Sequence, residues 1–218
     1  MVKVIYIVGV MFLFCIISCT KDNYIDTGIS KNRFDGNMLE YMESHSYDWD
    51  STVVMIRHAG ADMVTLFEGR EPGHEKITFL GITNHSIRRY LLMNGINSVR
   101  DLDPEWCRSI LLQHVIDRKL YRKDIPEGKL GDFGTVGEGG VVVNTLAGTQ
   151  VWMYVVLQEA NGIKEHAARP IFLNFIRFSS FSLFSSAIKN FNIASGDIEP
   201  DNGLVHALEY KFTLGDEE

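Results

Sequence analysis

The spacing of apolar residues changes near residue 120, and this change constrains the fold more than any other feature of the chain. Before it, apolar side chains recur at helical spacing, first over residues 38–49 and 51–58. After it, β-branched and aromatic runs separated by turn residues cover residues 141–146, 151–157, 171–176, 188–193 and 204–212. Helices followed by antiparallel strands predict one α+β domain, without an internal repeat or linker.

Capping residues set the expected helix ends in the first half. Ser51 is a candidate N-cap, and Gly60 is expected to end the helix that follows it. Residues 77–82 read as a strand that feeds a helix capped by Asn84. Asp103 before Pro104 predicts the start of another helix. The core face of that helix is expected to carry Trp106, Ile110 and Leu111.

An apolar run at residues 4–17 follows the single cation Lys3 and contains no acid. A membrane-spanning helix needs about 20 apolar residues, so this shorter run is typical of a cleaved signal peptide. The tetrapeptide that ends at Cys19 resembles a bacterial lipobox, in which a small residue precedes the acylated cysteine. Cys15 does not fit this pattern, because the bulky Phe14 precedes it.

These features predict four segments: a signal peptide at residues 1–18, a lipidated tether at 19–37, the domain at 38–214 and an acidic tail at 215–218. Any order in the polar tether is expected to come from a neighbouring segment. Acylation of Cys19 would hold the protein on a membrane without crossing it. An ordinary signal peptide with an incidental Cys19 is the alternative. Lys21 and Asp22 faintly resemble a signal for the outer face of the outer membrane.

The charge of the mature chain argues against a nucleic-acid partner. Removing residues 1–18 takes away one of the 21 Lys and Arg residues and none of the 28 Asp and Glu residues, which leaves a formal charge of −8. The chain also lacks a Lys/Arg cluster of the kind that follows phosphates. Cys107 has no remaining partner for a disulfide, so we expect it to be a small buried apolar residue and not a nucleophile.

Three segments resemble the motifs of fasciclin domains. Residues 77–84 are similar to the family's strand that ends in F-x-P-T-N/D, with Ile82 in place of the proline and with Thr83 and Asn84 at its end. Residues 110–116 are similar to its L-x-x-H-V-V segment, which contains His114. Residues 196–208 are similar to its closing D-I-x-x-x-N-G-V-V-H-V-I-D signature, which contains Asn202, Gly203 and His206.

The resemblance implies a fasciclin-like fold, with N-terminal helices packed on a mostly antiparallel β-sandwich or wedge. It covers roughly residues 38–214, and together with the leader it resembles a fasciclin-domain lipoprotein of a Bacteroides-like bacterium. Residues 161–191 form a longer stretch than the family has between its last strands. The loop geometry of fasciclin domains therefore cannot be transferred to these residues.

The motif residues have the character of structural residues. Asn84 is expected to cap a helix, and Asn202 with Gly203 to supply the positive φ angles of a tight turn. His114 and His206 are expected to bond the main chain between helices and sheet. The alternative is that these histidines belong to a binding site.

Catalytic and metal-binding patterns are missing from the sequence. The seven histidines form no i,i+4 helical pair and have no cysteine partners, so neither a metal nor a cofactor is expected. The glycine-rich residues 131–140 lack the Lys-Ser/Thr of a phosphate loop and predict a flexible hairpin or surface loop. No Gly-x-Ser-x-Gly elbow occurs.

Phenylalanines recur at every third position from Phe172 to Phe184 in a serine-rich segment. Phe175, Phe178, Phe181 and Phe184 form a candidate binding patch for a protein or a sugar, because some of these rings would point outward from a strand. The alternative is that most of them are buried.

We therefore expect a lipid-anchored, non-catalytic binding or adhesion module at a bacterial outer membrane, with a protein or glycan ligand. An accessory glycan- or substrate-binding lipoprotein of a polysaccharide-uptake system is the alternative. An envelope hydrolase is a third reading.

Overall fold

The structure is a computed structural model, and it describes residues 32–131, 136–160, 163–177, 186–187 and 189–216. Cys19 and most of the expected tether lie outside the described residues, as do Phe178, Phe181 and Phe184. Among the residues that are described, no helix has both the length and the apolar composition needed to cross a bilayer.

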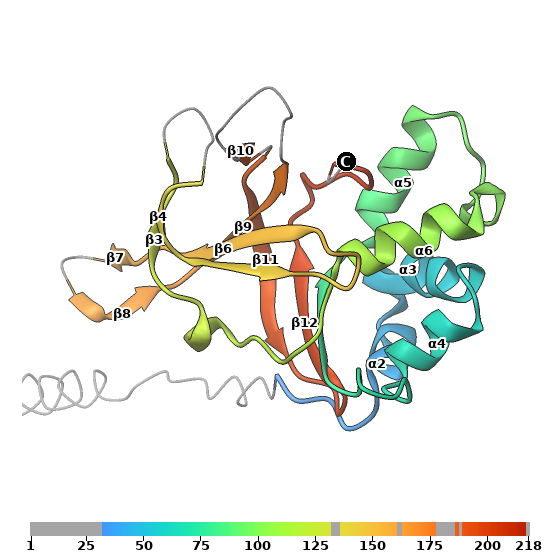
Figure 1. The fold of residues 1–218 in the computed structure, drawn as a ribbon, viewed down its shortest axis with the longest axis horizontal. Coiled ribbons are helices and arrows are strands. Elements are labelled where there is room, and N and C mark those ends of the chain that lie inside the picture. Colours follow the sequence, from blue (N-terminus) through green and yellow to red (C-terminus); the bar gives the residue numbers. More distant parts are fainter. Residues whose placement is uncertain (1–31, 132–135, 161–162, 178–185, 188, 217–218) are drawn as a thin grey trace, which may run out of the picture. The chain divides into compact units, whose positions relative to one another are not determined.

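Five α-helices are described in the first half of the chain. They are α2 (Met38–Ser44), α3 (Ser46–His58), α4 (Ala61–Phe67), α5 (Asn84–Met93) and α6 (Pro104–Gln113). Two 3₁₀ turns, η1 (Val99–Asp101) and η2 (Arg122–Asp124), follow α5 and α6. Helix α3 contacts the other four α-helices. Figure 1 shows the helices gathered on one side of the sheet.

Twelve strands are described. They are β1 (Ile77–Gly81), β2 (Val115–Ile116), β3 (Gly128–Lys129), β4 (Glu138–Gly139), β5 (Val141–Asn144), β6 (Gln150–Val155), β7 (Gln158–Ala160), β8 (Ile163–Ala168), β9 (Ile171–Arg177), β10 (Ser186–Ala187), β11 (Phe191–Ile198) and β12 (Gly203–Leu208). Strands β3–β4 and β7–β8 form separate two-stranded ribbons on the side away from the helices (Figure 1).

The main sheet is nearly closed. Its strand order is β2-β1-β12-β11-β9-β6-β5, with β10 paired to β9. All neighbours in this order are antiparallel except β1 and β12, which run parallel. The two ends of the order meet, because Ile116 bridges Thr145 and the Leu146 N–H donates to the Val115 carbonyl at 2.8 Å. The predicted mixed fold with mostly antiparallel strands is confirmed, whereas two layers of a sandwich are not seen among the described strands.

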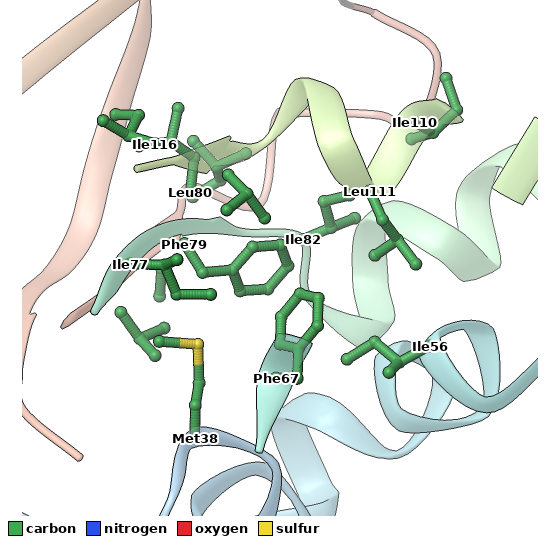
Figure 2. Close-up of a cluster of buried hydrophobic side chains, with 14 of the residues drawn as sticks. Met38, Ile56, Phe67, Ile77, Phe79, Leu80, Ile82, Ile110, Leu111 and Ile116 are labelled. Atoms are coloured by element: carbon green, nitrogen blue, oxygen red, sulfur yellow. The ribbon is translucent and has the colours of Figure 1, made fainter. Parts of the chain in front are cut away.

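Strand β1 lies at the centre of the core. All five of its residues are buried, because helices cover it and strands flank it on both edges. Phe79 packs edge to face on Phe67 of α4, with ring centroids 4.9 Å apart, as Figure 2 shows. A Cβ at Gly203 would collide with the Ile77 carbonyl, so glycine permits the close parallel pairing of β1 and β12.

One predicted helix boundary is wrong and another is confirmed. Ser51 is not an N-cap, because it lies inside α3, and the break between α2 and α3 falls at His45. Asp103 and Pro104 do begin α6 as predicted, with the Asp103 carboxylate accepting from the Trp106 N–H at 2.8 Å. Ile110 and Leu111 are fully buried in the core, as predicted, whereas Trp106 is half-buried and stacks on Tyr90.

The strand predictions hold best in the interior of the sheet. Strands β5, β6 and β9 lie at the predicted places. Strand β11 begins three residues later than predicted and continues to Ile198, and β12 ends at Leu208 instead of Phe212. The arms of the glycine-rich hairpin pair as β3 and β4, while residues 132–135 between them lie outside the described residues.

The last residues of the expected tether belong to the folded domain. The Phe34 N–H donates to the Glu199 carbonyl at 2.9 Å, and the Asp201 N–H donates to the Gly36 carbonyl at 2.8 Å. Asn37 then caps α2 through a reciprocal bond with Glu40. The order here comes from a neighbouring turn, as expected, and it begins before residue 38.

Candidate functional site

Asn84 holds the first turn of α3 and does not cap its own helix. The N-cap position of α5 is Thr83, whose hydroxyl makes no capping bond. The Asn84 side chain accepts from the Ser51 N–H at 2.7 Å and donates to the carbonyls of Tyr47 at 2.8 Å and Ser46 at 3.0 Å. These three groups belong to the first turns of α3. The Asn84 carboxamide therefore holds this end of α3 from outside, and the predicted capping role is wrong.

Asn202 joins two helix ends to the turn before β12. Its side-chain oxygen accepts from the Met38 N–H at 2.6 Å, at the start of α2. Its side-chain nitrogen donates to the Phe67 carbonyl at 2.9 Å, at the end of α4. The predicted turn is present, with the Gly203 N–H donating to the Pro200 carbonyl, but neither Asn202 nor Gly203 has a positive φ angle. Asn202 instead joins the ends of α2 and α4, and Gly203 permits the close pairing of β12 with β1.

His206 is fully buried and bonded at both ring nitrogens. Its Nε2 lies 2.8 Å from the Leu120 carbonyl, and its Nδ1 accepts from the Asp197 N–H at 3.1 Å. These partners fix the neutral tautomer with the proton on Nε2. Burial lowers the pKa of His206 below its ordinary value, although the Leu120 bond opposes this shift.

His114 joins helix α6 to strand β1. Its Nδ1 lies 2.9 Å from the Leu80 carbonyl, and its own carbonyl accepts from the Leu80 N–H at 2.8 Å. Its ring packs against Phe175 and Phe212, with centroids 5.1 Å and 5.3 Å away. Both motif histidines therefore bond the main chain, as the sequence suggested.

The phenylalanine patch is wrong at Phe175. This ring is 1% exposed and belongs to the core with Phe212 and His114. Phe172 is half-buried and stacks on Tyr154. Cys107 is buried as predicted, and burial raises its pKa to about 11, which keeps the thiol protonated.

A hollow of about 500 Å³ opens between the first turns of α3 and α5, and we call it the outer hollow. Tyr47, on its rim, is 81% exposed, and the rim also carries the opposite charges of Asp50 and Arg88. The His85 ring packs against Tyr210, which is 56% exposed, with centroids 4.5 Å apart. The lining residues are Ser46, Tyr47, Asp50, Asn84, His85 and Arg88.

Arg88 and Arg89 of α5 differ in their contacts at this surface. Arg89 donates to the Lys211 carbonyl at 2.9 Å, to the Thr213 hydroxyl at 3.2 Å and to the Tyr210 carbonyl. These bonds hold Tyr210 against His85. Arg88 is exposed on the rim and has no ion pair among the described residues.

The outer hollow brings together residues that the sequence did not single out, apart from Asn84. Tyr47 is exposed because α3 begins at Ser46, so that the buried face of α3 starts at Trp49 and continues through Thr52 and Val53. Because the sequence pattern predicted a helix break near Ser51, it did not indicate that Tyr47 lies on the exposed face of α3. The amphipathic pattern of α5, with buried Ile87 and exposed Arg88, is the signal that could have revealed the rim.

The charged groups of the outer hollow do not form a metal centre. No group of three or more His, Cys, Asp or Glu side chains among the described residues could hold a metal ion. A second hollow of about 240 Å³ lies beside α4 and α6. Two of its lining residues are engaged in ion pairs, Arg108 with Asp62 of the same lining and His74 with Asp117 outside it. The outer hollow is the better candidate for recognition, because its aromatic and charged side chains reach solvent.

Comparisons with known proteins find similarity among solved structures. No model of a known protein family matches the sequence, and no curated protein matches it. Among solved structures, the chain is similar to a FAS1 domain pair from the insect cell adhesion molecule fasciclin I. The TM-score is 0.46 and the sequence identity 15%, over 82% of this chain and 46% of that chain. This chain spans less than half the length of that domain pair.

Proposed function

We propose that this chain is a lipid-anchored, non-catalytic binding module of the fasciclin type that adheres to a protein partner at a bacterial envelope. The observation that carries the proposal is the outer hollow, where Tyr47 and Arg88 are exposed and where exposed Tyr210 packs on the lining residue His85. Tyrosine and arginine contribute more to protein–protein binding energy than most residue types. The polar side chains of four motif residues, in contrast, bond the main chain of their own domain: Asn84, His114, Asn202 and His206.

The exposed face of α5 extends the same surface. Leu92 is 75% exposed and lies one helical turn after Arg88, so His85, Arg88 and Leu92 share one face. An apolar side chain beside an arginine and two tyrosines is typical of the centre of a protein interface. We place the adhesive surface on this face of α5 and the first turn of α3.

The anchor completes the proposal. Acylation of Cys19 would hold the domain at the outer membrane through a polar segment, and two or three acyl chains suffice for stable attachment. A module attached in this way, and displayed on the outer face, meets partner proteins without turning over a substrate. The buried, main-chain-bonded state of His114 and His206 supports a non-catalytic role.

The test is adhesion of cells that display the lipidated protein. Replacing Tyr47 and Arg88 together by alanine removes two exposed anchors that line the outer hollow, and we expect at least a tenfold loss of adhesion, because such anchors are worth about 1–2 kcal/mol each. The melting temperature should stay within about 2 °C, since both side chains are exposed.

Val142→Ala is the matched control, because Val142 is an exposed side chain on β5. Adhesion should survive this change. Equal adhesion by the double variant and the control would contradict the proposal.

A glycan ligand is the second candidate, as in an accessory lipoprotein of polysaccharide uptake. The open outer hollow favours it through the packed rings of His85 and Tyr210 beside the polar groups of Asp50 and Arg88. Binding of the purified protein to immobilised glycans, abolished by Tyr210→Ala, would favour this role over protein adhesion.

A further inference from the structure

An inner cavity of about 110 Å³ lies between the helices and strands β11 and β12. It adjoins the outer hollow, because Tyr210 lines it and packs on His85 of the outer hollow. Tyr47 and Asn84 line the outer hollow, and their sequence neighbours Asp48 and Thr83 line the inner cavity. The lining residues are Tyr41, Asp48, Trp49, Thr83, Ala194, Ser195, Ile198, Ala207, Leu208 and Tyr210.

Thr83 carries an unpartnered hydroxyl in this lining. Its side chain is 3% exposed, and its Oγ1 has no hydrogen-bond partner among the described residues. Two other buried threonines differ from it: Thr52 donates to the Ile82 carbonyl, and Thr78 donates to the Arg118 carbonyl at 2.6 Å. A buried polar group without a partner is costly, so a ligand that bonds the Thr83 hydroxyl would recover that cost.

Asp48 is the one charged residue in the lining. Its carboxylate forms no ion pair or hydrogen bond with any described side chain, and it is half-buried. Asp48 and Tyr41 line the same cavity. Burial raises the pKa of the Tyr41 phenol, and the negative charge of Asp48 adds to this rise. An ionised carboxylate only accepts hydrogen bonds, so a ligand that brings its own donors would match it.

The remaining walls suit a cation with an apolar stem. Tyr41, Trp49 and Tyr210 contribute three aromatic side chains, and Ile198 and Leu208 contribute aliphatic ones. Aromatic rings attract ammonium groups, and this attraction grows when the group leaves water. A volume of about 110 Å³ holds an ammonium group with the last methylenes of its stem.

We propose that the inner cavity binds a primary ammonium group, the end of a lysine side chain that a partner protein inserts past Tyr210. The ammonium has three N–H donors. The Asp48 carboxylate, the Thr83 hydroxyl and the Ser195 hydroxyl are the acceptors that the lining offers to them. The site rests on the proposed function, because it names the anchor with which the partner of the outer hollow is held.

A small probe tests the site apart from adhesion. Nα-acetyl-lysine methylamide, titrated by NMR into the mature chain while the Trp49 indole N–H is observed, should bind, and the uncharged norleucine analogue should bind at least tenfold more weakly. Asp48→Asn should weaken the lysine probe by at least tenfold. Equal binding of the two probes, no binding of either, or binding unchanged by Asp48→Asn would overturn the proposal.

Thr83→Val supplies a second readout, which a merely structural residue would not give. The change removes an unpartnered hydroxyl and no capping bond, so it should raise the melting temperature of the free protein by about 2–4 °C while it weakens the lysine probe several-fold. Thr52→Val is the matched control: it breaks the bond to Ile82 and should lower the melting temperature. A fall in melting temperature for both variants would overturn the proposal.

The two proposals fail separately. If the Tyr47 and Arg88 variant loses adhesion but the wild-type protein does not bind the lysine probe, the adhesive surface is supported and the ammonium site is refuted. If the wild-type protein binds the probe but the variant keeps its adhesion, the ammonium site is supported and the adhesive surface is refuted.

Discussion

At the scale of single residues, His206 shows how a buried titratable group ties stability to pH. Its two ring nitrogens are matched to an acceptor at Leu120 and a donor at Asp197, so the neutral form fits and the protonated form does not. Asp197 and Arg122 are the charged groups nearest to it, and they act in opposite directions on its pKa. Burial outweighs both and lowers the pKa below the ordinary value of 6.5.

The pH dependence follows from the direction of this shift. Below pH 6.5 the unfolded chain binds a proton at residue 206 before the folded chain does, so stability is lost as the pH falls from 6.5 until the folded pKa is reached. We expect this residue to lower the free energy of unfolding by up to about 1.4 kcal/mol per pH unit in that window. Urea unfolding of wild type and His206→Gln between pH 5 and 7 measures it.

Glutamine is the informative replacement, because its amide offers one donor and one acceptor and does not titrate. The variant should show a flatter pH profile over this window. Carboxylates with a lowered pKa, such as Glu199, whose bonds to Lys119 and Tyr121 lower it, act below pH 4.5 and do not interfere. Identical slopes for wild type and variant would refute the assignment to His206.

The sequence predicted the chemistry of the motif histidines but not that of the asparagines. A buried histidine must bond something, and the main chain is the commonest partner, so the general expectation sufficed. Asn84 and Asn202 bond main-chain groups 33 and 164 positions away, at Ser51 and Met38. Capping and turn rules consider only near neighbours in the sequence, so they assigned both asparagines to the wrong partners.

At the scale of elements, α3 depends on a side chain from α5. Asn84 contributes three hydrogen bonds to the first turns of α3, so Asn84→Ala should lower the free energy of unfolding by about 2–3 kcal/mol. The same change should weaken adhesion, because Tyr47 lies in the turn that Asn84 holds. Chemical denaturation and the adhesion assay measure the two effects.

Asn94→Ala is the control at the C-cap of the same helix. Asn94 is exposed and bonds only the Tyr90 carbonyl one turn earlier, so its loss should cost less than about 0.5 kcal/mol. Similar losses for both asparagines would show that the bridge to α3 contributes little.

The apolar pattern within α3 explains why its boundary was misplaced. Apolar spacing restarts at Ser51, whose N–H donates to Asn84, although α3 is continuous from Ser46 to His58. A local pattern reads such a point as a new helix. The true break at His45 coincides with a backbone conformation outside the helical region, φ −119° and ψ 51°, which no proline or glycine marks.

At the scale of the whole molecule, the sequence predicted the kinds of elements and not their closure. Residues 77–82 and 204–212 are predicted as strands, but the parallel register of Ile77 with Gly203 joins positions more than a hundred residues apart. The short strand β2, two residues long, closes the sheet against Thr145 and Leu146. Neither pairing leaves a local signal, because each depends on which strands become neighbours.

The start of the folded domain gives a last prediction at this scale. Residues 32–37 connect the helices to the turn before β12 through the bonds of Phe34 and Gly36, the Arg33–Asp201 ion pair at 3.0 Å and the Asn37 cap. A chain that begins at residue 38 loses all of them. We expect it to be about 3 kcal/mol less stable than a chain that begins at residue 32, with most of the loss from the cap and the two main-chain bonds, since the ion pair is exposed.

Thermal unfolding of the two truncated chains measures this difference, which corresponds to a fall in melting temperature of about 6–12 °C for a domain of this size. A chain that begins at residue 19 is the reference, and the chain from residue 32 should match it if residues 19–31 act only as a tether. Equal melting temperatures for the chains from residues 32 and 38 would instead extend the tether to residue 37. In that case the bonds to Glu199 and Asp201 would be too weak to hold the segment.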